Sequence, residues 1–203
     1  MDFIFNLDLP MFIKTIGYLG IFIIIFAESG LFFGFFLPGD SLLFTTGLLA
    51  SQGYFDILIL ILLITLAAIL GDQIGYLFGL KIGPKIFIRN DSFFFKKKYI
   101  SDAENFYRKH GKKAVLIARF IPIVRTFIPI LAGVGKMYYA TFVTYNIFGG
   151  LIWGAGITLL GYFLGQQIPN IDKYLIPIIF LIVLISISPT IFSFIYSKIK
   201  NIN

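Results

Sequence analysis

The sequence of 203 residues contains no cysteine, which excludes disulfide bonds and thiol chemistry. Charged residues are scarce as well: they make up 13% of the chain, against roughly 25% in soluble domains, so an ordinary water-soluble enzyme is excluded. The same apolar bias excludes a disordered chain. The single histidine, His110, lies in a basic stretch, RKHGKK, without a second histidine or an acidic cluster. We therefore expect no metal site.

Hydrophobic residues, in contrast, make up 58% of the chain and give it a mean hydropathy of +0.91. These values are typical of a small integral membrane protein. A helix that crosses a hydrocarbon core of about 30 Å needs about 20 apolar residues. We predict an all-α membrane protein in which four stretches span the bilayer, residues 12–27, 57–80, 138–165 and 174–196.

Two further apolar stretches, residues 31–50 and 114–135, are interrupted by charged residues and prolines. Proline removes a backbone donor and breaks a helix. Irregular backbone within a membrane is tolerated only where it is buried in protein or lines a wet cavity. Both stretches are therefore predicted to form re-entrant helical hairpins. The residues expected to shape them are Pro38, Gly39, Pro122, Pro129 and Gly133.

The 17 basic residues outnumber the 10 acidic ones and are unevenly distributed. Ten of them lie in residues 81–113, which we predict to be a basic amphipathic connector on the cytoplasmic side, because Lys and Arg mark cytoplasmic loops. Lys198 and Lys200 place the C-terminus on the same side, and the number of spans places the N-terminus there too. The two hairpins then enter the membrane from opposite faces. Whether residues 92–107 form a surface helix is left open.

A short motif recurs in the two halves of the chain. GYLFG at residues 75–79 reappears as GYFLG at residues 161–165, 86 positions later, and at the same offset Gly47 corresponds to Gly133. Together with the opposed hairpins, this repeat predicts a single membrane domain with two inverted halves. Inverted repeats whose broken helices meet near the midplane are typical of transporters. The predicted halves are residues 12–80 and 114–165.

Besides Asp72 and Lys14, which is expected to be a snorkelling anchor, four ionisable residues lie within or beside the apolar stretches: Glu28, Asp40, Arg119 and Arg125. A charge inside a membrane costs a few kcal/mol even on lenient scales, so such residues are candidates for function. A guanidinium group suits phosphate oxygens, which makes the two arginines candidates for binding a lipid phosphate. The two acids are candidates for carrying protons, because burial raises a carboxyl pKa and a neighbouring arginine lowers it. A static ion-pair network that only stabilises the fold is the alternative.

Asp72 is a secondary candidate, near the cytoplasmic end of its predicted span. We expect it to have a structural role, as a cap or as a partner of Lys81 or Lys85. Trp153 is expected to be a packing or interface residue.

The sequence resembles the DedA family of bacterial membrane proteins, which is related to the eukaryotic VTT-domain proteins. The resemblance covers roughly residues 17–165 and depends on Glu28 together with four motifs, FLPGD at 36–40, GDQIGY at 71–76, RFIPIVR at 119–125 and PILAG at 129–133. It implies two opposed re-entrant hairpins and a role in moving lipids across the membrane. The family's functional positions fall on Glu28, Asp40, Arg119 and Arg125.

For bacterial members, the resemblance implies envelope maintenance that depends on the proton motive force, and some members look like flippases for undecaprenyl phosphate. We therefore expect a proton-coupled flippase for an anionic lipid phosphate in the bacterial plasma (inner) membrane. A gradient-independent phospholipid scramblase and a non-transporting envelope scaffold are the alternatives. No enzymatic activity, cofactor other than protons, or nucleic-acid partner is expected, and self-association through the glycine-rich span is left open.

Overall fold

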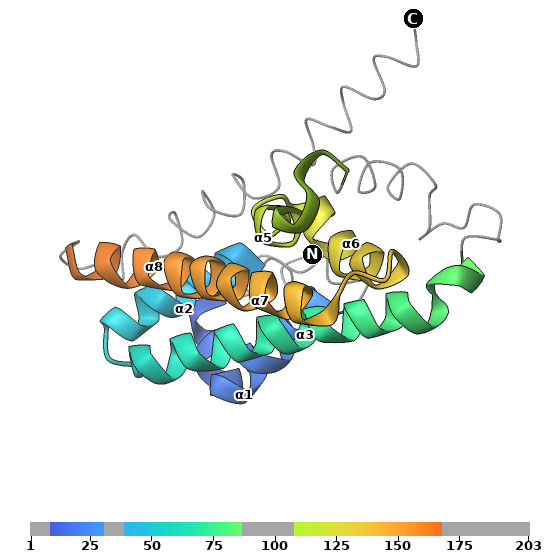
Figure 1. Ribbon diagram of the computed structural model, residues 1–203. Coiled ribbons are helices and arrows are strands. Elements are labelled where there is room, and N and C mark those ends of the chain that lie inside the picture. The colour runs from blue at the N-terminus through green and yellow to red at the C-terminus, as the bar shows by residue number, and fades with distance from the viewer. Residues whose placement is uncertain (1–8, 31–38, 87–107, 168–203) are drawn as a thin grey trace, which may run out of the picture.

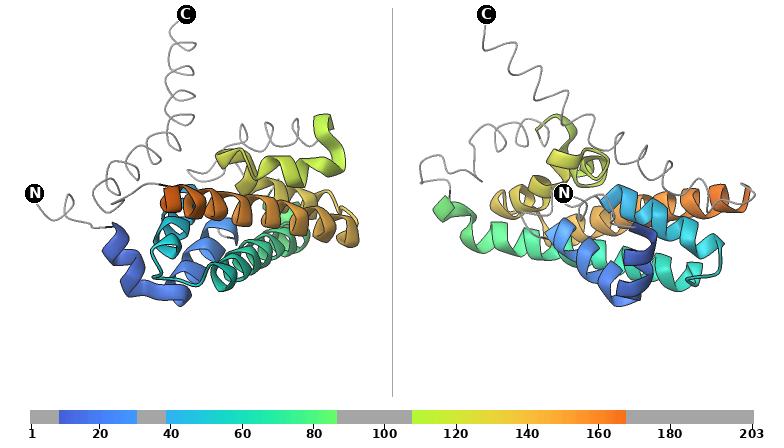
Figure 2. Two further views of the ribbon diagram at one scale, coloured as in Figure 1. Left: turned by 90° about the vertical axis from the view of Figure 1, so that its left-hand side faces the viewer. Right: turned by 180° about the vertical axis from the view of Figure 1, so that it is seen from behind.

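The computed structural model describes residues 9–30, 39–86 and 108–167, and these residues form helices joined by short turns, with no strand among them. Figures 1 and 2 show the arrangement. The helices are, in order, α1 (Leu9–Gly30), α2 (Gly39–Ser51), α3 (Ile57–Ile86), the 3₁₀ turn η2 (Gly111–Lys113), α5 (Ala114–Ala118), α6 (Pro122–Val134), α7 (Tyr139–Gly150), the π-helical turn η3 (Leu151–Ala155) and α8 (Gly156–Gln167). The last three form one continuous helix.

Three helices are long and apolar enough to cross a membrane: Ile13–Gly30, Ile57–Lys81 and Tyr139–Gln167. They coincide with three of the four predicted spans. The fourth predicted span, residues 174–196, lies outside the described residues, as do both chain ends and most of the predicted connector. Helix α3 continues to Ile86, beyond the predicted end of its span, because a helix need not stop where its apolar run stops.

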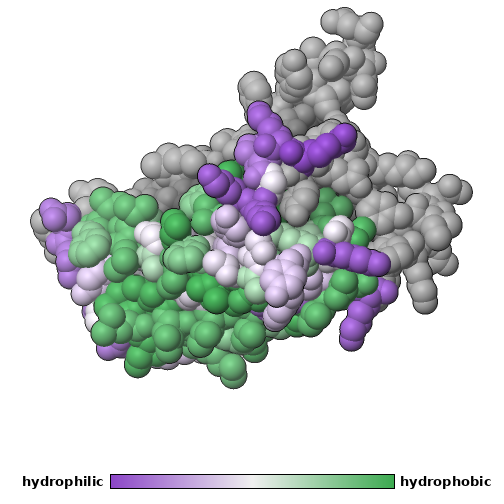
Figure 3. Space-filling view, in the orientation of Figure 1, coloured by the Kyte–Doolittle hydropathy of each residue, from purple (hydrophilic) through white to green (hydrophobic). Residues whose placement is uncertain are grey.

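The outer surface of the helices is apolar. In α3, large side chains at nearly every fourth position are exposed, and they form one stripe along the helix: Leu58, Leu62, Leu66, Leu70, Ile74 and Leu77. Figure 3 shows apolar side chains over most of the visible face, with polar ones at its upper edge and ends. An exposed apolar surface of this extent is stable against lipid and not against water.

Helices α2 and α6 have 13 residues each, which corresponds to about 20 Å and is too short to cross a hydrocarbon core of about 30 Å. Pro38 lies outside the described residues, so the first predicted hairpin is described only from Gly39 onward. In the second, the chain turns at residues 119–121 and Pro122 starts α6, a position that proline favours.

Pro129 was expected to interrupt its segment, but it lies inside α6, which continues to Val134. Proline removes one hydrogen bond from a helix, and packing can compensate for that loss. Pro129 is buried against α3 where that helix has no side chain: a Cβ atom added to Gly75 would lie 3.2 Å from the Pro129 Cβ. Tight packing on a glycine therefore keeps α6 helical through its proline.

Helix α2 packs most extensively on α8, and the right-hand view of Figure 2 shows the two side by side. Their backbones are in contact at two glycines. A Cβ atom added to Gly47 would overlap the carbonyl oxygen of Thr158, and one added to Gly161 would overlap that of Phe44. Small residues allow membrane helices to approach this closely.

Helix α6 packs on α3 in the same way. A Cβ atom added to Gly133 would overlap the carbonyl oxygen of Tyr76, and one added to Gly79 would overlap that of Ile130. Each short helix therefore packs on the long helix of the other half. Gly133 lies within α6, and its contact with Tyr76 explains why a larger residue does not fit there.

The two contacts correspond to each other, but not with a single offset. Gly47 and Gly133 are 86 positions apart, as the sequence motif predicts, whereas their partners Gly79 and Gly161 are 82 positions apart. The sequence offset matches Gly161 of α8 with Gly75 of α3, whereas the structural contacts match it with Gly79, one helical turn further along. The glycines recur at a spacing of four residues within each motif, so a match by sequence pattern can slip by one turn.

Candidate functional site

Arg125 of α6 lies between two carboxylates from different helices. Its Nη1 atom is 3.1 Å from Asp40 Oδ1, at the start of α2, and its Nη2 atom binds Glu28 Oε1, near the end of α1. The side chain of Glu28 is 1% exposed, that of Arg125 15% and that of Asp40 28%. Asp40 is therefore the most accessible of the three groups, and the structure brings three of the four predicted residues into one cluster.

Gly39 allows this cluster to form. A Cβ atom added to Gly39 would overlap the carboxylate of Glu28, so the first turn of α2 lies directly on that acid. The glycine was predicted as a hairpin-shaping residue. Its structural role is narrower: it lets Glu28 and Asp40 share Arg125.

Trp153 also belongs to this cluster, although the sequence indicated only packing. It is 2% exposed and lies in the π-helical turn η3. Its indole Nε1 donates a hydrogen bond to Asp40 Oδ1 at 2.8 Å, and the Arg125 Cζ atom is 5.1 Å from the centroid of its ring. The available signal was a single tryptophan within a glycine-rich apolar span, and that signal does not reveal a π-turn.

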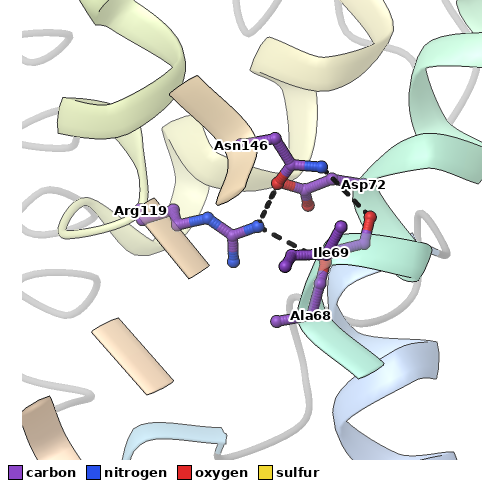
Figure 4. A network of polar contacts seen from close by, with 5 residues as sticks. All are labelled: Ala68, Ile69, Asp72, Arg119 and Asn146. Carbon is purple, nitrogen blue, oxygen red and sulfur yellow. Dashed lines mark hydrogen bonds and ion pairs between the residues drawn. The ribbon is translucent and has the colours of Figure 1, made fainter. Parts of the chain in front are cut away.

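Arg119, at the end of α5, binds a different set of partners, shown in Figure 4. Its Nη2 atom is 2.6 Å from Asp72 Oδ2 and also donates to Asn146 Oδ1 and to the Ala68 carbonyl oxygen. Asn146 in turn donates to the Ile69 carbonyl oxygen at 3.1 Å. The other terminal nitrogen of Arg119 points away from Asp72 and Asn146. These bonds connect α5 to α3 and α7.

Asp72 was expected to act as a cap or to pair with Lys81 or Lys85 on its own helix, and the structure pairs it with Arg119 instead. An α-helix turns by about 100° per residue, so Lys81, nine positions on, lies on the opposite side of α3. The side chain of Asp72 is 7% exposed, whereas Lys81 is exposed. Asn146 was not identified as a site residue from its position. The sequence feature that could have identified Asn146 is a side-chain amide within an apolar span.

A small pocket of about 10 Å³, roughly the space of one water molecule, lies between the two arginine networks. Residues from α1, α3, α5, α6 and η3 line it: Glu28, Ser29, Asp72, Arg119, Arg125, Thr126 and Trp153. The pocket therefore joins elements from both halves of the chain.

The polar groups of this region are incompletely satisfied. Among the described residues, the buried atoms without a hydrogen-bond partner include Glu28 Oε2 and Arg119 Nε. An unpaired buried polar atom costs about 1–3 kcal/mol, so these atoms indicate a site that is not optimised for stability alone.

The two networks together contain three carboxylates and two guanidinium groups, so one negative charge is in excess when all are ionised. This arrangement can bind an anion through the guanidinium groups and take up protons on the carboxylates. Within residues 9–30, 39–86 and 108–167, no group of three or more His, Cys, Asp or Glu side chains is placed to hold a metal ion.

Comparison with known proteins places the site within a family. The VTT domain matches residues 37–163, which is more than half of the chain. Protein DedA of Escherichia coli (strain K12) is 40% identical over 98% of this chain and 93% of its own length. Inner membrane protein YqjA of the same strain is 40% identical over 77% of this chain and 71% of its own. An uncharacterized membrane protein of Mycobacterium tuberculosis is 47% identical over 86% of this chain and 77% of its own. No solved structure matches significantly.

Proposed function

Since the chain belongs to the DedA family of VTT-domain membrane proteins, we propose that it moves an anionic lipid phosphate across the membrane in a proton-coupled step. Undecaprenyl phosphate is the proposed substrate, and the bacterial inner membrane is the proposed location. One observation carries the proposal: two largely buried arginines and two carboxylates line a pocket in a chain whose outer surface is apolar, and a third carboxylate, Asp40, binds one of these arginines.

The phosphate group is proposed to bind at Arg125. Its guanidinium group already binds two carboxylates from two other helices, and phosphate oxygens can replace either of them with the same geometry. Arg119 lies across the pocket and supplies a second positive charge. A lipid headgroup in this position would leave its hydrocarbon tail in the membrane, beside the apolar surface of the helices.

Protons are proposed to enter with the phosphate, because the networks already have an excess of negative charge. A phosphate with one or two negative charges would increase that excess in a medium of low dielectric constant, where each uncompensated charge costs several kcal/mol. Protonation of Glu28 or Asp40 removes one of these negative charges and releases Arg125 from that acid. Loss of the proton on the opposite side would then displace the phosphate.

Transport in vesicles tests the proposal. Purified protein is reconstituted with a labelled undecaprenyl phosphate, and its transfer between leaflets is measured with and without a proton gradient. We expect Arg125→Ala to slow gradient-driven transfer by about tenfold or more, since a hydrogen bond to a charged group contributes about 1.5–3 kcal/mol. Lys109→Ala is the matched control, because Lys109 is an exposed basic residue away from the pocket.

Each outcome of this assay separates the functional classes. Transfer at the same rate without the gradient would support a scramblase and contradict proton coupling. No transfer by the unaltered protein would support a scaffold. We propose that no bond of the lipid is broken, so release of inorganic phosphate in the same vesicles would contradict this part and indicate an enzyme.

The proposed orientation has a direct test, because the chain has no cysteine of its own. Lys109 and Tyr54 are both exposed, and each can be replaced by a single cysteine. We expect Lys109→Cys in intact cells to be protected from a membrane-impermeant thiol reagent and Tyr54→Cys to react. The reverse pattern would contradict the cytoplasmic placement of residues 81–113.

A further inference from the structure

We propose that Trp153 is a positioning residue that holds Asp40 ready to exchange a proton when the substrate phosphate binds Arg125. The inference rests on the proposed function for the role of Asp40, but the contact itself can be tested without transport. It concerns a residue whose sequence pattern indicated only packing.

The geometry places one side chain against both members of an ion pair. The edge of the Trp153 ring donates to Asp40 Oδ1 at 2.8 Å, and the same oxygen accepts from Arg125 Nη1 at 3.1 Å. The face of the ring lies toward the guanidinium group, with 5.1 Å between the Arg125 Cζ atom and the ring centroid, within the range of a cation–π interaction. Asp40 therefore has one charged donor and one neutral donor on a single oxygen.

The neutral donor is held more firmly than the charged one. Trp153 is buried in the core formed with α1, α2 and α3. Two glycines press its helix onto α3: added Cβ atoms would lie 3.0 Å from Ile69 Cγ1 at Gly150 and 3.1 Å from Ile64 Cγ2 at Gly154. The π-helical turn between residues 151 and 155 sets the direction of the indole, and such turns occur frequently at functional sites.

This difference matters when a phosphate binds. A phosphate that takes Arg125 removes the charged donor from Asp40, and the indole N–H is then the donor that remains from this pair. The charged groups linked to Asp40 are Arg125 from α6 and, through that arginine, Glu28 from α1; Asp72 and Arg119 line the pocket together with Arg125 and Glu28. A hydrogen bond to the ionised carboxylate favours the ionised form. Trp153 thus sets the pH range over which Asp40 can accept a proton.

Fluorescence tests the contact directly, because Trp153 is the only tryptophan in the chain. The protein is placed in phosphatidylcholine nanodiscs with and without undecaprenyl phosphate, and its emission is titrated with pH. We expect the emission of the unaltered protein to change with pH and this change to disappear in Asp40→Asn, which keeps an oxygen acceptor but does not titrate. An unchanged titration in Asp40→Asn would overturn the proposal.

Transport by Trp153→Phe tests the function. Phenylalanine keeps an aromatic face for Arg125 and removes the N–H donor. We expect the pH profile of transfer to shift upward by about one to two pH units, because the ionised carboxylate of Asp40 loses a hydrogen-bond donor. The apparent KM for the lipid should stay within about twofold, because Arg125 is unaltered. Phe148→Leu, at an exposed position of the same helix, is the control.

A sulfur analogue of tryptophan, β-(3-benzothienyl)alanine, provides a second replacement at position 153 if the phenylalanine variant does not fold. It has nearly the shape of the indole and lacks the donor, so the same shift is expected. A pH profile identical to that of the unaltered protein would overturn the role of Trp153 and leave the transport proposal standing. If the unaltered protein moves no lipid, the transport proposal fails. The fluorescence titration still decides whether the emission of Trp153 depends on the protonation of Asp40.

Discussion

The two arginines of the pocket differ in their partners more than in their burial. Arg119 is bound by one carboxylate, one side-chain amide and one backbone carbonyl, so its charge is matched one to one. Arg125 is shared by two carboxylates from two helices, and both arginines lie near the Trp153 ring, with their Cζ atoms 5.1 Å (Arg125) and 6.0 Å (Arg119) from its centroid. The charge of Arg119 is balanced without a ligand, although its Nε atom has no hydrogen-bond partner, whereas Arg125 has a surplus acid that can be replaced. The comparison indicates that Arg119 mainly fixes the fold and that Arg125 exchanges partners.

The largest expected effect on stability comes from Asp72→Ala. This change leaves Arg119 buried without its counter-charge, and breaking a buried pair by removing one partner costs about 3–5 kcal/mol. The measurement is the free energy of unfolding in detergent. Asp56→Ala is the control: that exposed carboxylate only accepts hydrogen bonds from the first backbone N–H groups of α3, which contributes about 1 kcal/mol. Equal unfolding free energies of the two variants would contradict the proposed structural role of the Arg119 network.

Glu28→Gln is expected to lower transport strongly and the free energy of unfolding only slightly. Arg125 keeps Asp40 as a charged partner, so the free energy of unfolding should fall by less than in Asp72→Ala. Gradient-driven transfer should fall by about tenfold, because a hydrogen bond to a charged group contributes about 1.5–3 kcal/mol. Both quantities are measured on one preparation. If Glu28→Gln unfolds as easily as Asp72→Ala and still transports lipid at the normal rate, the Arg125 network has the structural role and the proposed difference between the two arginines is wrong.

The smallest effect is expected from Gly47→Ala, which tests whether the Arg125 site depends on the position of α2. The added Cβ atom would overlap the Thr158 carbonyl oxygen and force α2, which carries Asp40, away from α8. Overpacking of this kind costs about 1–3 kcal/mol. Gly156→Ala is the matched control in α8, because nothing lies within 4 Å of its added Cβ atom and alanine favours a helix.

Gly47→Ala should also lower transport more than its loss of stability explains, because it moves Asp40 and leaves the Arg119 network in place. The measurement compares transfer rates of the Gly47→Ala and Gly156→Ala variants at a temperature where both are folded. Equal rates would show that the exact position of α2 does not matter for the site.

Much of the site could be predicted from the sequence because the relevant cost is local. An ionisable residue in an apolar stretch is recognisable wherever its partner lies, and this criterion selected Glu28, Asp40, Arg119 and Arg125. The same criterion did not select Trp153, which carries no charge. It also ranked Asp72 below the others, because a lysine on its own helix offered an apparent partner.

The pairing of these residues could not be read from the sequence. Glu28 and Arg125 are 97 positions apart, and Asp72 and Arg119 are 47 positions apart, so their contacts depend on how separate helices are rotated and packed. The one-turn slip of the glycine repeat has the same origin. Within a helix, glycines four residues apart are interchangeable by pattern, and only the packing on the opposite helix distinguishes them.

The sequence by itself determined the membrane class, the family, three of the described spans and the charged residues of the pocket, because hydropathy and the cost of a buried charge are properties of short segments. The tertiary structure decided that Arg119 pairs with Asp72, that Arg125 is shared by Glu28 and Asp40, and that Trp153 joins them. These contacts follow from the rotation of helices about their axes and from glycines that let backbones touch. Both are fixed by packing between distant parts of the chain.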